Sequence, residues 1–313
     1  MSEQKQIAVR KTEFDTVIRL VNITISSARV KTITYGRPSG DTRTISGNIH
    51  LGLFGRYSSL KSTILEAVKE EKKEKAVIVH SLTVASLVGS IDARRNIPIM
   101  PLAWEVRNKV LMIDEFQSNR KEKKYVIEAL NSLLSTGKFE KEFIATTKSE
   151  IDLEENGLYC KITNGKISIK TNFSLIIASM KPIEDFLKWE NQRAFFSRLI
   201  PVTYEIDRVT QKAIVEGFKK IEIQEYPVQE KITLSTEAFL EIERFLEHYG
   251  FENLQGYNRL LETLIRIRAV LGYFDEDLSL QVAEMYRSAE EIAEKIDRAR
   301  EAHLAFWSSR VRA

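Results

Sequence analysis

The chain has 313 residues, of which 43% are hydrophobic and 29% charged, with a formal net charge of +3. This length is enough for one large core, or for a core with a smaller second domain, and the near-balanced charge excludes a generally basic nucleic-acid-binding surface. A single cysteine, Cys160, excludes an internal disulfide framework. With no apolar run of about 18 residues and no secretory leader pattern, we expect a cytoplasmic protein without a membrane partner.

The predicted elements begin with a helix in TEFDTVIRLVNITISSA, followed by a turn-rich approach, GDTRTISGN. Between residues 48 and 206, short apolar runs rich in β-branched residues alternate with helical stretches. Such unalternating runs are typical of parallel strands that are covered on both faces. The expected strands are Ile49–Phe54, Ala76–His80, Lys109–Asp114, Phe173–Ser179 and Ile200–Glu205.

After residue 207 the apolar residues take helical spacing, as in STEAFLEIERFLEHYG and GYNRLLETLIRIRAVLGYF. The sequence therefore predicts an α/β fold in three parts. These are an N-terminal helix and approach (1–47), an α/β core with a central parallel sheet (48–206) that carries a hairpin insert (about 138–172), and a small all-α lid with a C-terminal helix (207–313).

The stretch LGLFGRYSSLKSTIL has the phosphate-binding pattern G-x-x-x-x-G-K-[ST], with Leu60 where the second glycine belongs. A loop between a strand and a helix directs backbone N–H groups at phosphate oxygens. In this interpretation Lys61 reaches the β- and γ-phosphates and Ser62 gives an oxygen to Mg²⁺. A plain turn followed by a surface lysine is the alternative. The candidate loop residues are Gly55, Arg56, Tyr57, Ser58, Ser59, Leu60, Lys61, Ser62 and Thr63.

The apolar run KVLMIDEF ends in the acidic pair Asp114-Glu115. Asp114 would hold Mg²⁺, and Glu115 would polarise the attacking water as a general base. Acidic pairs that merely cap a strand are common. A phosphate loop followed by a strand-end Asp-Glu nevertheless indicates a site for ATP and Mg²⁺.

Two arginines are candidates for a site shared between subunits. Arg198 lies between a helical segment and an apolar strand, and Arg259 begins a later helix. An arginine in such a place can reach the γ-phosphate of a neighbour and stabilise the charge that develops on transfer. An ordinary helix-end arginine is the alternative, and for Arg193, Arg266 and Arg268 a structural role is favoured.

These four elements, in this order, resemble an AAA+ ATPase and, more narrowly, the ATPase module of the minichromosome maintenance (MCM) replicative helicases. The resemblance covers about Asp41 to Met285, and that family also lacks the second loop glycine. The matching stretches are GDTRTISGNIHLGLFG, LTVASLVGSI, IDEF, FFSRL and RLLETLIRI.

By this resemblance Arg198 is an arginine finger that acts in trans, and Arg259 is a sensor 2 arginine that serves the same neighbouring site. A homo-oligomeric ring, expected to be a hexamer, follows. The sensor 1 position falls on Lys181, where the family has asparagine, and Ser179 is the alternative. Without the family's N-terminal DNA- and zinc-binding region, the chain looks like a reduced motor from a virus, plasmid or mobile element.

The stretch YCKITNGKISIK predicts a β-hairpin, since Asn164-Gly165 favours a type I′ turn. The MCM family places a hairpin here that points into the ring channel, so Lys161, Lys166 and Lys170 are candidate contacts to DNA phosphates. A solvated lysine-rich hairpin is the alternative. The preceding acidic stretch SEIDLEEN argues against a DNA contact there.

The leading hypothesis is an MCM-like AAA+ ATPase that couples ATP hydrolysis to translocation on, or unwinding of, single-stranded or forked DNA in replication. Two alternatives remain open. One is a DNA-bound AAA+ regulator that recruits replication or transposition partners without unwinding. The other is a protein-remodelling ATPase like the MoxR or magnesium-chelatase groups. The histidines have no metal-ligand spacing and are expected to be structural: His50, His80, His248 and His303.

Overall fold

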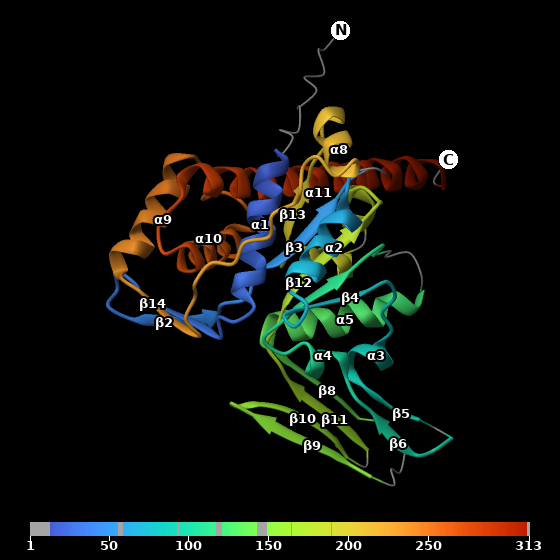
Figure 1. Ribbon diagram of the computed structural model, residues 1–313. Coiled ribbons are helices and arrows are strands. Elements are labelled where there is room, and N and C mark those ends of the chain that lie inside the picture. Colours follow the sequence, from blue (N-terminus) through green and yellow to red (C-terminus); the bar gives the residue numbers. More distant parts are fainter. Residues whose placement is uncertain are drawn as a thin grey trace.

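The computed structural model describes residues 13–55, 59–92, 94–116, 121–142, 149–163, 165–188 and 190–311. At its centre is a five-stranded sheet in the order β13-β3-β12-β7-β4, and every pair in it is parallel (Figure 1). The mixed α/β class and the central parallel sheet are thereby confirmed. Its strands match the five expected runs: β3 (His50–Phe54), β4 (Ala76–Val79), β7 (Val110–Ile113), β12 (Ser174–Ser179) and β13 (Ile200–Thr203).

Helices cover both faces of this sheet, which explains the unalternating apolar strands. On one face Met112 and Ile176 pack in a core with α1 (Phe14–Ser27) and α2 (Lys61–Glu71). On the other face Leu111 and Ile177 pack in a second core. That second core is formed with α5 (Lys121–Thr136), α6 (Ile183–Leu187), α7 (Glu190–Phe196) and part of α11 (Glu276–Val311).

A second sheet joins the N-terminal and C-terminal parts of the chain. Its order is β14-β1-β2, with β1 (Thr32–Gly36) antiparallel to β2 (Thr42–Ser46) and parallel to β14 (Lys231–Leu234). The sequence pattern predicts only helices after residue 207, so β14 is a correction to that part of the prediction. A four-residue strand is too short for periodicity to separate it from a loop.

The helices of the C-terminal part follow the predicted spacing. They are α8 (Arg208–Val215), α9 (Thr236–His248), α10 (Tyr257–Leu271) and α11. The Ser235 hydroxyl accepts a hydrogen bond from the Ala238 N–H at 3.2 Å, which caps the start of α9. No helix in the described part of the chain is long and apolar enough to cross a membrane.

The predicted hairpin lies within a four-stranded antiparallel sheet, β8-β11-β10-β9, at the bottom of Figure 1. Its strands are β8 (Lys138–Glu142), β9 (Ile151–Glu155), β10 (Leu158–Thr163) and β11 (Lys166–Lys170). The hairpin strands β10 and β11 are therefore confirmed, and Asn164 of the turn lies outside the described residues. Short elements near this sheet are α3 (Val84–Val88), β5 (Ser90–Asp92), β6 (Ile97–Ile99) and α4 (Leu102–Glu105).

Cys160 lies in β10 on the buried face of this sheet, and burial raises the pKa of its thiol to about 11. At pH 8 we expect a thiol reagent to react with the folded protein about a hundredfold more slowly than with protein unfolded in urea, because the thiolate is the reactive species. With a reagent that releases a coloured product when it reacts with a thiol, absorbance measures both rates. Equal rates would contradict the covered face of β10.

Candidate nucleotide site and arginine pocket

The predicted phosphate loop connects the end of β3 to α2, which begins at Lys61. The Lys61 ammonium donates hydrogen bonds to the Gly55 carbonyl oxygen at 2.9 Å and to the Ser59 hydroxyl at 2.6 Å. Burial lowers the pKa of Lys61 to about 8, while the charge of Asp114 acts in the opposite direction. A buried cation held by a carbonyl and a hydroxyl is well placed to receive an anion.

Two further observations concern this loop. Arg56, Tyr57 and Ser58 lie outside the described residues. The Tyr204 hydroxyl, which no sequence motif singles out, donates to the Ser59 carbonyl oxygen at 2.8 Å from the end of β13. Burial raises the pKa of Tyr204 above its usual range, so the phenol stays protonated and remains a donor.

Leu60 adopts a left-handed backbone conformation, with φ 57° and ψ 23°, immediately before α2. This conformation costs an L-residue roughly 1–2 kcal/mol, which is the physical reason that glycine suits the position. The Leu60 side chain is partly buried against the core next to α2. That burial offsets part of the backbone cost.

Leu60→Ile is expected to lower the free energy of unfolding by about 1 kcal/mol, because a β-branched residue at positive φ is more strained than leucine. Isoleucine keeps the apolar volume, so the change isolates the backbone conformation. Urea denaturation measures it. The control Leu60→Met, which is unbranched, should stay within about 0.5 kcal/mol of the parent. Equal stability of the two variants would contradict the left-handed assignment.

The acidic pair lies at the end of β7, beside the start of α2. The Ser62 hydroxyl donates to Asp114 Oδ1 at 3.1 Å, and the Glu115 N–H donates to the same oxygen at 2.9 Å. His80 Nδ1 lies 3.8 Å from Asp114 Oδ2. Asp114 is buried, whereas Glu115 is exposed and has a positive φ of 53°. The two oxygen groups predicted to hold Mg²⁺ therefore lie together.

These residues fit Mg²⁺ better than a metal with an all-protein cage. Within the described residues no group of three or more His, Cys, Asp or Glu side chains could hold a metal ion. Magnesium is usually held by one or two protein oxygens together with phosphate oxygens and water. Ser62 and Asp114 supply those two oxygens.

The sensor 1 candidate lies between the loop and the acidic pair. Its strand, β12, pairs with β3 on one side and with β7 on the other. The Lys181 N–H donates to the buried Ser179 hydroxyl at 3.1 Å, just past the end of β12. The first turn of α2 presents Thr63 to solvent. The described candidates in the loop, the acidic pair and sensor 1 thus gather at the carboxyl edge of the sheet, where α/β sheets bind ligands.

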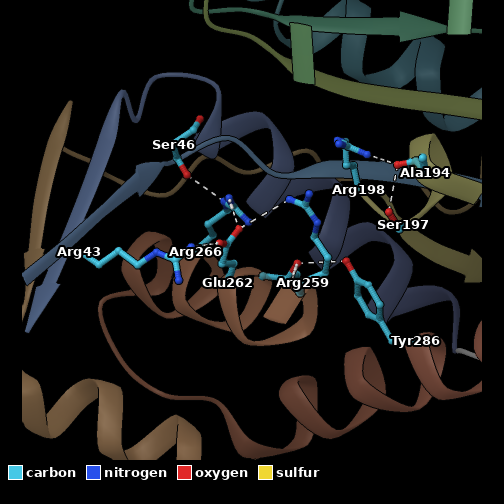
Figure 2. Close-up of polar contacts among 10 residues, drawn as sticks. Arg43, Ser46, Ala194, Ser197, Arg198, Arg259, Glu262, Arg266 and Tyr286 are labelled. Carbon is cyan, nitrogen blue, oxygen red and sulfur yellow. Dashed lines mark hydrogen bonds and ion pairs between the residues drawn. The ribbon is translucent and has the colours of Figure 1, made fainter. Parts of the chain in front are cut away.

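Arg198 and Arg259, by contrast, line a different pocket together with Arg266 (Figure 2). His50 also lines this pocket. Burial and the charge of Arg259 lower the pKa of Arg198. Arg198 donates through Nη1 to the Ala194 carbonyl oxygen, while its buried Nε has no partner within the described residues. The pocket therefore concentrates positive charge around a donor that has no acceptor.

One carboxylate, that of Glu262, lies between Arg266 and Arg259 and balances part of this charge (Figure 2). Glu262 lies 3.2 Å from Arg266, 3.3 Å from Arg43 and 3.9 Å from Arg259. Arg266 also donates through Nε to the Ser46 carbonyl oxygen at 2.8 Å. None of the described residues that line the cavity is acidic. An anion entering it would meet three guanidinium groups, of which Arg266 and Arg259 also lie within 4 Å of Glu262.

The three rival arginines all make contacts of the structural kind that the sequence favours. Arg193 forms a two-bond ion pair with Asp297 at 2.6 and 2.8 Å, and Arg268 pairs with Glu241 at 2.8 Å. Both have the structural role expected of them. Arg266 pairs with Glu262, and it also lines the pocket with the two predicted arginines. Periodicity alone could not place it there, since the pocket is made from β3, β13 and α10 together.

The pocket and the phosphate loop lie at opposite edges of the parallel sheet. His50 begins β3 and Ile200 begins β13, and both line the pocket, whereas the loop follows Phe54 at the other end of β3. A five-residue strand is roughly 13 Å long. The guanidinium groups turn toward the amino edge of the sheet, so they do not reach the loop of their own chain.

The three candidate lysines of the hairpin share one face of the four-stranded sheet with acidic neighbours. Lys161 Nζ lies 3.1 Å from Asp152, and Lys166 Nζ lies 3.0 Å from Glu140. Lys170 is opposite Lys138 in the strand register. This face is therefore charge-mixed, and it carries less free positive charge than the sequence alone indicates.

No protein-family model matches the chain, and a search of the curated proteins finds no relative. A function must therefore be argued from the two sites and their placement. One site places a buried lysine near a hydroxyl–carboxylate pair. The other site, at the opposite edge of the sheet, gathers three arginines.

Proposed function

We propose that the chain is an ATPase of the AAA+ type, in which ATP and Mg²⁺ bind between the phosphate loop and the acidic pair. The observation that carries the proposal is the hydrogen bond of 3.1 Å between Ser62 and Asp114, beside the buried ammonium of Lys61. These three groups come from the start of α2 and the end of β7, and they converge where a triphosphate needs a cation and two metal ligands.

In this proposal each side chain has a separate task. Lys61 binds the β- and γ-phosphates, and Ser62 and Asp114 orient the metal ion. The exposed carboxylate of Glu115 accepts the proton of the attacking water. Lys181, at the end of the intervening strand, contacts the γ-phosphate. Bound Mg²⁺ would neutralise charge on the phosphate oxygens.

The arginine pocket supports a shared site. Because Arg198 and Arg259 turn away from their own loop, we propose that they stabilise the transferring phosphate of a neighbouring copy. A contact between two different surfaces of one chain repeats head to tail, and it closes into a ring when the rotation permits. The resemblance to MCM proteins makes that ring a hexamer.

We propose DNA as the substrate of the motor, on the resemblance to MCM proteins. A second candidate is the remodelling of a protein substrate, and the ion pairs of Lys161 and Lys166 favour it, since they reduce the charge available for phosphates. A DNA-bound ATPase that recruits replication or transposition partners would bind DNA without separating its strands. Strand displacement on a forked duplex distinguishes that role from unwinding.

Single-stranded DNA is expected to stimulate ATP hydrolysis, and the triple variant Lys161→Ala/Lys166→Ala/Lys170→Ala is expected to weaken DNA binding. For every DNA phosphate that a lysine no longer neutralises, the salt dependence of log K should fall by about 1. Fluorescence anisotropy across a salt series measures this slope. Lys212→Ala, on exposed α8, is the control. An ATPase indifferent to DNA would contradict the DNA assignment and favour protein remodelling.

A further inference from the structure

His50 is a buried histidine at the start of β3, only 7% exposed, and it lines the arginine pocket. Its spacing in the sequence predicts only a structural role. Its Nδ1 accepts a hydrogen bond from the Leu175 N–H at 3.2 Å, across the pairing of β3 with β12. Within the described residues this is the one hydrogen bond that the structure gives the ring.

This contact determines which nitrogen carries the proton. Because Nδ1 is an acceptor, a neutral His50 carries its hydrogen on Nε2. Since Nδ1 is turned to the strand, Nε2 is the ring nitrogen left for the cavity. Burial, and then the charges of Arg266 and Arg198, lower the pKa of His50 to about 3, so the ring stays neutral at physiological pH.

The pocket has the composition of an anion site. It combines three arginines with no acidic lining residue among those described, and the buried Nε of Arg198 has no partner there. Its cavity of about 30 Å³ has room for roughly two water-sized atoms. That is room for about two oxygens of a tetrahedral anion, whose other oxygens would lie at the mouth of the pocket, and it is too small for a nucleoside.

We propose that this pocket binds a tetrahedral oxyanion within the single subunit, and that His50 donates its Nε2–H to that anion beside Arg198 and Arg259. A neutral donor adds a hydrogen bond without adding a fourth cation to an already repulsive cluster. The identification of the anion as the terminal phosphate of a neighbour's ATP rests on the proposed function. Binding of free phosphate does not.

The test uses the full chain carrying Lys61→Ala, so that its own phosphate loop does not compete, and inorganic phosphate as the probe. Phosphate is titrated at constant ionic strength, with chloride as the compensating anion. The midpoint of thermal unfolding is followed at each concentration, since a ligand that binds the folded state raises it. The expected result is a rise that grows with the logarithm of the phosphate concentration above the Kd, and a fitted Kd that is at least tenfold weaker in Arg198→Ala or Arg259→Ala.

Two substitutions isolate the donor of His50. In His50→Asn the side-chain oxygen can replace Nδ1 as the acceptor for the Leu175 N–H, but no group reaches the place of Nε2. His50→Gln can place an amide N–H there. Loss of one hydrogen bond to a charged acceptor should weaken phosphate binding about tenfold in His50→Asn, with partial recovery in His50→Gln. Unchanged affinity in His50→Asn would overturn the role of His50.

A second measurement keeps the proposal testable if the His50 variants do not fold. In the Lys61→Ala chain, ¹⁵N-labelled histidine should show one ring protonated on Nε2 whose resonance moves, and then saturates, as phosphate is added. The three other histidines should not move. No shift and no rise in the unfolding midpoint would overturn the anion site.

The anion site and the proposed function fail differently. A chain that binds phosphate in this pocket but has no ATPase activity contradicts the proposed function and leaves the anion site intact. A chain with Arg198-dependent ATPase activity, whose Lys61→Ala form does not bind phosphate, contradicts the anion site alone. To test the neighbour's nucleotide as the source, Lys61→Ala/His50→Asn chains are mixed with Arg198→Ala chains. Activity at least tenfold below a mixture without the His50 change is expected.

Discussion

Lys61→Ala is expected to lower ATP hydrolysis at least a hundredfold, and it should abolish measurable nucleotide binding. The physical reason is the loss of the only ammonium held over the described part of the loop, where it contacts Gly55 and Ser59. A triphosphate at that place would keep its charge uncompensated in a partly buried site. Phosphate release at saturating ATP and Mg²⁺ measures the effect.

The fold of this variant should persist, because the hydrogen bonds that Lys61 makes to Gly55 and Ser59 lie in the loop at the edge of the central sheet. Near-ultraviolet circular dichroism checks the packing. Lys69→Ala provides a matched control, since Lys69 lies on the same helix and is exposed. Hydrolysis at the parental rate in Lys61→Ala would show that the site lies elsewhere.

Arg198→Ala is expected to lower the turnover number about a thousandfold while nucleotide binding by the same chain stays within threefold, since an arginine finger acts on the transition state of the neighbouring site. We expect turnover and nucleotide binding to respond differently, because the Arg198 guanidinium lies at the edge of the sheet opposite the loop of its own chain. Phosphate release and the binding of a fluorescent ATP analogue measure the two quantities.

The matched control for this prediction is Arg298→Ala. Arg298 is an exposed arginine of α11, paired with Glu294 at 2.9 Å, and lies away from the pocket. Its loss should leave hydrolysis within twofold of the parent. If Arg198→Ala lost nucleotide affinity together with turnover, Arg198 would belong to a site of its own chain.

Much of the fold could be predicted from the sequence because its signals are local. Unalternating apolar runs such as Val110–Ile113 identify strands that are buried on both faces, and helical spacing identifies α9 to α11. The strand β14 was not predicted, because its pairing with β1 joins residues about two hundred positions apart in the chain. Local periodicity carries no information about such a partner.

The candidate sites also divide into features with a local sequence signal and features that depend on tertiary packing. A loop motif of fixed spacing identifies Lys61 and Ser62 as candidates, and the acidic pair at a strand end identifies Asp114, since a site for phosphate and Mg²⁺ would require those groups. The loop motif does not show that Leu60 is left-handed, because the conformation depends on how the loop enters α2. The arginine pocket was anticipated only in part. Arg266 and His50 reach it through the packing of α10 against the strands, which no spacing rule describes.

The most direct measurement of a shared active site mixes two inactive chains. Lys61→Ala keeps the arginine pocket and loses the loop lysine, whereas Arg198→Ala keeps the loop and loses the proposed arginine finger. If each site is completed by a neighbour, an equal mixture recovers hydrolysis at about a quarter of its interfaces, the fraction that pairs an intact loop with an intact Arg198 at random. A mixture no more active than its two components would contradict the shared site.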